Sequence, residues 1–417
     1  MGTTNQSILY GALVLSCLLL PKLMIRLLKH KRVMGFAFIG YILWMGANGV
    51  GVWGTMVPAS VIVGIVAAPL WTAQCSYFTK VAGKYCKLVN CTEEAAVSVF
   101  FGIFFCFFQT ASILGSIISS TVLRPRTEGG DKPPTPEALA YCGYRDCPYQ
   151  QGNVTNPNLE KPKSSVIWTM VGIYMGVAFC AVIIILSPLV DPLQRELEDE
   201  KKPLKEEAFS LFIGTVRHLK HKKQLLLIPI TMYSGLEQAF FSAEWNNSFI
   251  TCTIGIWKVG LATLPFGVVN AICSFSSGRL VKYIGRWPFF LIGFLIDFGI
   301  LIALTRWRPD PGKEYLFYII SGLWGLTDGI WQTQINALYG CAFKDSEAAF
   351  SNYRMWESLG SIIAFAYSKY ICTNAKIYVQ ISVLCVGIIG YSIVEIMLYK
   401  NKRLTKTTTV EPDQNED

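Results

Sequence analysis

Long apolar segments dominate this sequence and restrict the folds that it can adopt. Each segment has about 20 residues, the length that a helix needs to cross a hydrocarbon core of about 30 Å. Lipid cannot hydrogen-bond an open backbone, so such segments form helices. The sequence therefore predicts an all-α membrane protein with about eleven transmembrane helices. The predicted spans are 7–27, 34–53, 55–77, 95–123, 165–187, 225–245, 255–276, 287–305, 314–338, 349–371 and 376–398.

The distribution of charge supports this class. Only 16% of the 417 residues are charged, against about 25% in soluble domains. The net charge of +9 does not indicate nucleic acid binding, because 24 of the 37 Lys and Arg residues lie in the segments that we place in the cytosol. This bias predicts an outside N-terminus and a cytosolic C-terminus. We expect membrane lipid as the surroundings and the plasma membrane as the location.

Sequence patterns of common enzymes and metal sites do not occur. Cys-x-x-Cys, Walker A, G-x-S-x-G and H-E-x-x-H are missing, and the three His residues are dispersed. These patterns supply the nucleophiles, phosphate cradles and metal ligands of many enzymes. We therefore expect no enzymatic activity, no metal and no cofactor.

A charged segment divides the chain into two membrane halves. We expect an N-terminal half at 1–187 with five spans and a C-terminal half at 225–399 with six. The cytosolic linker 188–224 turns from mixed charge to basic, and we expect an amphipathic helix near 206–222 that faces anionic lipid. The tail 400–417 is polar and predicted to be disordered.

The long loop 124–164 is the main feature outside the membrane. It carries the N-glycosylation acceptor Asn153, whereas the sequons at Asn246 and Asn5 lie close to spans and are less suited to modification. Cys142 and Cys147 are five residues apart in this loop, so a local disulfide between them is an open alternative in an oxidising compartment.

A second outer disulfide is a weaker alternative. Cys252 and Cys372 both lie near outer helix ends, where they are also exposed to oxidising conditions.

One loop motif resembles the major facilitator superfamily. The sequence from Gly278 to Arg286 is similar to the Gly-x-x-x-Asp-x-x-Gly-Arg loop between the second and third helices of each half, although Lys282 stands where Asp is usual. The basic run after Pro21 is its first-half equivalent. Aligning the two loops leaves one span before the first-half loop, so the first of the usual twelve helices is predicted to be missing.

Five blocks carry a more specific resemblance, to the uncoordinated-93-like family and its homolog A branch. The blocks are 67–77, 101–109, 234–240, 321–340 and 347–357. The resemblance implies a major-facilitator-like two-half helix bundle. It also implies three roles that family members have: potassium-channel regulatory subunit, trafficking partner of toll-like receptors, and orphan solute carrier.

A polar stripe runs along the predicted helix that contains Ser321 to Gly340. At 100° per residue, six side chains of this segment fall within an arc of about 120°. They are Ser321, Trp324, Asp328, Gln332, Asn336 and Tyr339. A carboxylate at membrane depth costs at least about 2.5–3.5 kcal/mol, so Asp328 needs a protein partner or a watery cavity.

The cavity of this fold lies between the two halves at mid-membrane. Glu237 and Asp328 are each near the middle of a span, and we expect them to be neighbours that line this cavity with Gln332 and Asn336. Trp71 and Gln74 are the first-half candidates, and two alternatives stay open for the carboxylates. They couple protons or substrate to transport, or they belong to a hydrogen-bond network that joins helices.

The remaining intramembrane charges have structural interpretations. Arg354 and Glu357 are three residues apart on one predicted helix face, so we expect an ion pair whose arginine snorkels to the cytosolic interface. Asp297 and Glu395 lie in predicted peripheral spans, where helix packing is the favoured use.

Two functions follow. The first is a secondary transporter of a small, cationic or proton-coupled solute, favoured by the fold and the polar stripe. The alternative is a non-transporting accessory of a potassium channel or a receptor, favoured by the missing helix, the altered loop motif and the roles of the resembling family.

Overall fold

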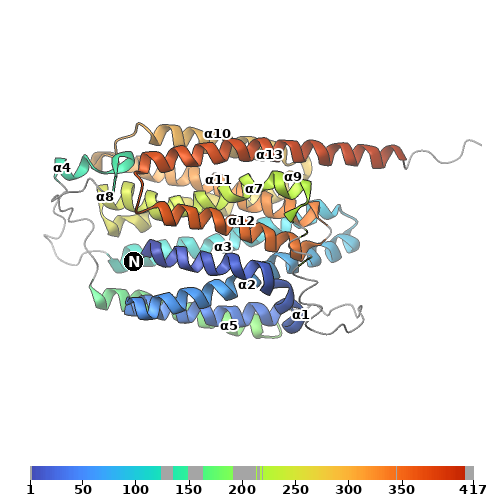
Figure 1. Ribbon diagram of the computed structural model, residues 1–417, viewed down its shortest axis with the longest axis horizontal. Helices are drawn as coiled ribbons and strands as arrows, with labels where there is room; N and C mark the ends of the chain where they lie inside the picture. Colours follow the sequence, from blue (N-terminus) through green and yellow to red (C-terminus); the bar gives the residue numbers. More distant parts are fainter. Residues whose placement is uncertain are drawn as a thin grey trace, which may run out of the picture.

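The helices of this protein run side by side along one axis of an elongated bundle (Figure 1). The computed structural model describes residues 2–123, 135–148, 163–190, 213, 217, 219–343 and 345–408, and contains no strand among them. The long helices are α1 (Gly2–Val50), α2 (Trp53–Val89), α3 (Glu93–Leu123), α5 (Ser164–Leu186), α7 (Lys222–Phe240), α9 (Val259–Ile284), α10 (Trp287–Leu304), α11 (Glu314–Ala342), α12 (Ser346–Tyr367) and α13 (Thr373–Thr408).

Two helices depart from a single regular span. α1 changes direction at Lys29, whose φ of 65° lies in the left-handed region, so it supplies two of the predicted spans (Figure 1). α7 continues through the π-helix η3 (Phe241–Thr251) into the short α8 (Cys252–Ile254). Counted in this way, the described residues contain the eleven predicted spans.

The spans differ in polarity. Seven helices of the described residues are long and apolar enough to cross a membrane by length and composition. α7, α11 and α12 fall outside that group because each carries polar side chains along a buried face. Nearly all of α11 from Ser321 to Gly340 is buried. The most polar spans therefore lie in the centre, and the apolar ones face outward.

Small residues allow α3 and α9 to cross at close range. A Cβ added at Gly278 would lie 2.6 Å from the carbonyl oxygen of Ser98 and 2.9 Å from the Cα of Gly102. No side chain fits at such distances, so the two helix backbones meet here directly. Small residues at crossings are a usual means of packing membrane helices, and this crossing joins a first-half helix to a second-half helix.

Two cysteines of the segment between α3 and α5 form disulfides with cysteines that follow α7 in the chain. Cys142 pairs with Cys252, and Cys147 pairs with Cys372. The alternatives Cys142–Cys147 and Cys252–Cys372 are therefore wrong. The reason is a 3-10 turn, η1 (Gly143–Arg145), which lies between the two loop cysteines and directs them to different helix ends.

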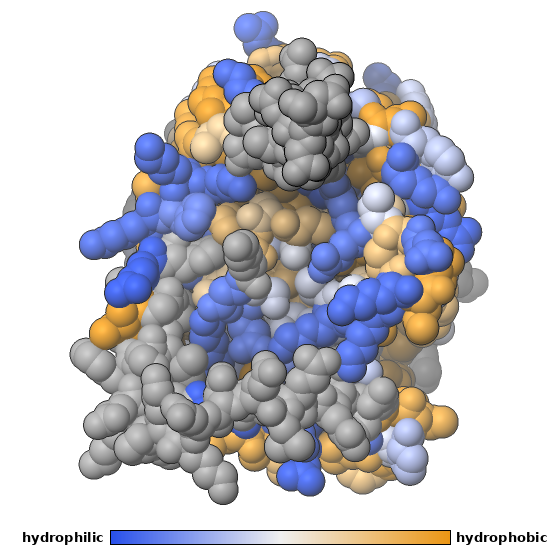
Figure 2. All heavy atoms as spheres, turned by 90° about the vertical axis from the view of Figure 1, so that its right-hand side faces the viewer, coloured by the Kyte–Doolittle hydropathy of each residue, from blue (hydrophilic) through white to orange (hydrophobic). Residues whose placement is uncertain are grey.

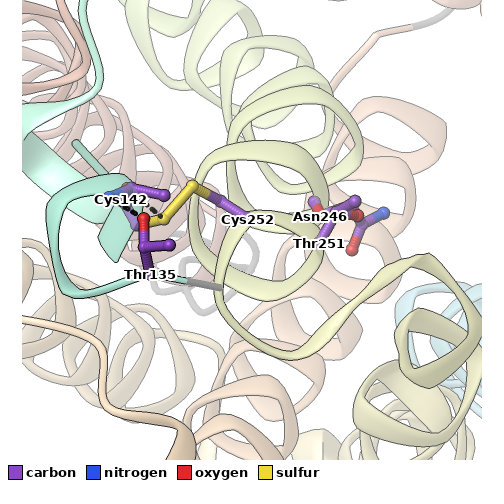
Figure 3. Close-up of a disulfide and its surroundings, with 6 residues drawn as sticks. Thr135, Cys142, Asn246, Thr251 and Cys252 are labelled. Atoms are coloured by element: carbon purple, nitrogen blue, oxygen red, sulfur yellow. Dashed lines mark hydrogen bonds between the residues drawn. A yellow bond between two sulfur atoms is a disulfide. The ribbon is translucent and has the colours of Figure 1, made fainter. Parts of the chain in front are cut away.

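Figure 3 shows the first of these bridges, with Cys142 beside Thr135 and Cys252 at the end of η3. The loop helix α4 (Pro136–Leu139) begins after Thr135, whose hydroxyl accepts a hydrogen bond from the Ala138 amide. The Thr373 amide donates to the Asp146 carbonyl at 2.9 Å. Residues 135–148 thus pack on the second half, although they are connected to first-half helices.

The sequons at span ends lie in helices. Asn246 is half-buried in η3, and its carbonyl accepts a hydrogen bond from the Thr251 hydroxyl at 2.6 Å (Figure 3). Asn5 is 3% exposed and its amide contacts the sulfur of Met56. Both placements agree with the expectation that these sites are less suited to glycans. Asn153 lies outside the described residues.

The ends of the predicted segments differ in detail. α13 continues to Thr408, so the tail that was predicted to be disordered from residue 400 begins as helix. The range 409–417 and most of the predicted amphipathic helix at 206–222 lie outside the described residues.

Candidate functional site

Arg354 lies where α12 meets the first half. It is 6% exposed, and its Nη1 lies 2.5 Å from Glu357 Oε2. Its Nη2 donates to Asn336 Oδ1 at 3.4 Å and to Cys75 Sγ at 3.7 Å. The predicted ion pair is therefore present. The predicted snorkelling is wrong, because the guanidinium finds its partners inside the bundle.

The first-half wall of this site comes from α2. The Arg354 guanidinium carbon lies 4.7 Å from the ring centroid of Trp71 and 4.8 Å from that of Tyr353. A desolvated cation over a Trp ring contributes about 2 kcal/mol. Gln74 is also buried there, and its Oε1 accepts a weak hydrogen bond from the Cys75 thiol at 3.5 Å. Among the described residues its Nε2 has no partner.

Glu357 connects three helices of the second half. Its Oε1 accepts from the Tyr353 hydroxyl at 3.0 Å and lies 3.5 Å from both Gln332 Nε2 and Ser234 Oγ. Gln332 also donates to the Ser234 hydroxyl at 2.9 Å. Gly235 permits this closeness, because a Cβ there would lie 1.8 Å from the Glu357 carbonyl oxygen.

Asp328 and Glu237 form a second, acidic group further along α11. Asp328 Oδ2 accepts from Asn270 Nδ2 at 2.6 Å. Among the described residues, Asp328 Oδ1 and both carboxylate oxygens of Glu237 have no hydrogen-bond partner. Gln332 is one turn from Asp328 on α11 and donates to Ser234, which is one turn from Glu237 on α7. The two carboxylates therefore lie on helix segments that contact each other, and their direct contact stays a prediction.

One carboxylate oxygen of Asp297 accepts two hydrogen bonds, which join three helices. Its Oδ2 accepts from the Tyr233 hydroxyl and from Trp331 Nε1, each at 2.7 Å. These donors belong to α7 and α11, whereas Asp297 lies on α10. The arrangement agrees with the helix-packing interpretation, since both donors bind the carboxylate within the second half.

The α11 stripe therefore passes through two electrostatic environments. At Asn336 it meets a compensated group in which Arg354 balances Glu357, and at Asp328 it meets carboxylates with unused acceptors. Compensated buried groups hold helices in one arrangement, whereas unused buried acceptors favour a proton or a cation. The described residues contain no cluster of three or more His, Cys, Asp or Glu side chains suited to a metal ion.

Several members of the site were not predicted. Cys75, Ser234, Asn270 and Tyr353 all contact predicted site residues. Cys75, Ser234 and Tyr353 lie inside sequence blocks that carried the family resemblance, but none of them carries a charge in its usual form. Small polar side chains and Tyr are common in helix interiors, so their sequence positions alone did not distinguish them.

Ion pairs connect the two halves at the end where α13 leaves the bundle. Lys80 pairs with Glu347 at 2.8 Å, and Glu94 pairs with Arg286 at 2.7 Å. Lys22 contacts Asp345 in the same way. Figure 2 views this end, where hydrophilic side chains surround a patch of apolar ones. The pairs hold the halves together on this side of the central site.

A family comparison matches nearly the whole chain. The model of a family described as "Ion channel regulatory protein UNC-93" matches residues 1–305 and 310–394. The chain is 38% identical to protein unc-93 homolog A of Xenopus laevis, over all of the chain and 90% of that protein. It is 38% identical to the human protein of that name, over 96% of the chain and 87% of that protein.

A more distant relative and a solved structure complete the comparison. The putative potassium channel regulatory protein unc-93 of Caenorhabditis elegans is 29% identical over 95% of this chain and 56% of its own length. The crystal structure of a major facilitator superfamily transporter, FucP, in the outward conformation superposes with a TM-score of 0.58 and 13% identity. It covers 94% of this chain and 89% of that one, which shows the fold.

Proposed function

The chain belongs to the UNC-93 family, and from this premise we propose that it is a non-transporting regulatory subunit of a membrane ion channel. The observation that carries the proposal is the alignment of 95% of this chain with a worm protein named as a potassium channel regulator. We infer a potassium channel as the class of partner. None of the relatives described above has the name of an enzyme.

The central contact between the halves fits such a role. Arg354 is bound from both halves at once, by Glu357 and Asn336 on one side and by Trp71 and Cys75 on the other. Removing one partner from a buried pair costs about 3–5 kcal/mol. Arrangements that separate Arg354 from its partners are therefore disfavoured, which supports a protein that holds one shape for a partner to bind.

The unpaired carboxylates favour a second candidate function, transport of a small cation or a proton. Glu237 is 1% exposed and Asp328 is 3% exposed, and three of their four oxygens have no partner among the described residues. A charged carboxylate in that position needs a counter-charge or a proton. In this second reading, Gln332 and Asn336 would line the solute path beside them.

The disulfides support one orientation of the protein in the membrane. Both disulfides lie at the end of the bundle that contains the N-terminus, and structural disulfides persist in oxidising compartments. We therefore propose an outside N-terminus and a cytosolic C-terminus, at the plasma membrane. The same proposal includes the division into membrane halves at 1–187 and 225–399, joined by the linker 188–224.

Recording of channel currents tests the main proposal. A panel of potassium channels is expressed in oocytes with and without the chain, and surface channel is quantified in parallel. We expect the chain to change the current per surface channel for at least one of them. The R354M variant should lose this effect, whereas K369A, which removes an exposed charge, should keep it.

A flux assay separates the two candidates. The purified chain in vesicles is tested for proton movement driven by an imposed gradient of small cations, beside D328N and E237Q. No flux together with an effect on channel currents supports the regulatory role. Flux that disappears in D328N and E237Q, with no effect on any channel, would replace it with transport.

A further inference from the structure

Two free cysteines meet at the turn between α2 and α3. Cys86 and Cys91 are free, and both are half-buried at the edge of the main apolar core. The next-closest free cysteines along the chain, Cys75 and Cys86, are eleven residues apart. The turn lies at the end of the bundle opposite the two disulfides (Figure 1).

The backbone of the turn brings their side chains together. α2 ends at Asn90, which has a φ of 53° and a ψ of 46° in the left-handed region. The Cys91 amide then donates to the Cys86 carbonyl at 3.3 Å. This is the 6→1 bond of a Schellman motif, in which the two end residues make a side-chain contact.

A side-chain contact also joins the two residues. The Cys86 thiol donates to the Cys91 carbonyl oxygen, so the Cys86 sulfur lies beside the main chain of Cys91. A disulfide requires Cα atoms about 4.4–6.8 Å apart. The main-chain hydrogen bond holds Cys86 and Cys91 at the two ends of one turn, so a disulfide between them would form within that turn.

We propose that Cys86 and Cys91 are a reversible dithiol–disulfide pair that exchanges with small disulfides such as glutathione disulfide. The proposal does not rest on channel regulation. One thiolate attacks a sulfur of the small disulfide, whose S–S bond breaks and releases one small thiol. The second thiolate attacks the resulting mixed disulfide and releases the other. The protein dithiol is oxidised by two electrons, and one small disulfide is reduced to two thiols.

Oxidation of Cys86 and Cys91 would affect an ion pair that connects the two halves. Cys91 is three residues before Glu94, which pairs with Arg286 of the second half at 2.7 Å. A covalent bridge removes freedom from the turn that presents Glu94. The oxidised pair therefore stiffens one of the contacts that hold the halves together at this end.

Differential alkylation of the full chain in membranes tests the proposal. Cells are quenched in acid and alkylated, and isolated membranes are equilibrated in glutathione buffers of graded ratio, with the two cysteines followed by mass spectrometry. We expect free thiols in quenched cells, and then loss of both thiols together with one midpoint as an internal disulfide forms. The lone half-buried Cys106 should stay alkylatable or form only a mixed disulfide with glutathione.

Two further measurements distinguish an internal disulfide from separate reactions of the two thiols. In C91S, Cys86 should form only the mixed disulfide. A trivalent arsenical, which bridges two thiols, should protect both cysteines of the unaltered chain from alkylation, so this readout does not depend on a variant that folds. Independent titration of the two cysteines, absence of arsenical protection, or a permanent disulfide in quenched cells would overturn the proposal.

Discussion

Replacement of Arg354 with methionine tests whether the buried ion pair holds the molecule together. The change keeps an unbranched apolar side chain but leaves Glu357, which is 8% exposed, without its cation. Loss of one partner of a buried pair costs about 3–5 kcal/mol. With an unfolding entropy of about 2.1 cal/mol/K per residue, the chain should melt about 3–6 °C lower.

The assay is thermal unfolding in detergent, followed by the amount of monodisperse protein that survives heating. E357Q should also destabilise the chain, because it leaves Arg354 buried without a counter-charge. The double variant R354M/E357Q removes both charges, so its loss should be clearly smaller than the sum of the two single losses.

The difference between the loss in the double variant and the sum of the two single losses measures the interaction between the two charges. Part of the R354M loss comes from the contact with Trp71, and E357Q does not restore it. A double variant whose loss equals the sum would show that the two charges do not interact. Because the pair lies within α12, Glu357 would then have no part in holding the Arg354 guanidinium against Trp71 and Cys75. The structural basis of the proposed regulatory role would fail with it.

The other predictions concern helix packing and the two disulfides. G278V should prevent accumulation of folded protein, because its Cβ would lie 2.6 Å from a backbone carbonyl oxygen; G299V, where no atom lies within 4 Å, should accumulate normally, and equal yields would refute the close crossing. C147S should leave Cys372 open to maleimide on intact cells while the other disulfide persists. Labelling of Cys142 instead would show the local pairing. D297N should lower the melting temperature, because a neutral amide oxygen accepts the hydrogen bonds of Tyr233 and Trp331 less strongly than a carboxylate oxygen does. An unchanged melting temperature would contradict this role.

Part of the site was within reach of sequence reasoning. Asp328, Gln332 and Asn336 recur every four residues along an apolar helix, and that periodicity placed them on one buried face. The expected closeness of Glu237 and Asp328 rested on mid-span position in a known type of fold. Arg354 was misplaced because its position near a helix end equally fits an arginine that reaches for the interface.

The sequence by itself determined the membrane class, the number of spans and the polar stripe, because span length and helical period are local properties. Only the tertiary structure decided which residues meet across the bundle. It assigned the disulfides of Cys142 and Cys147 to distant partners, and it placed Cys75 beside Arg354. Contacts of this kind depend on how helices far apart in the chain cross, and no local pattern encodes that geometry.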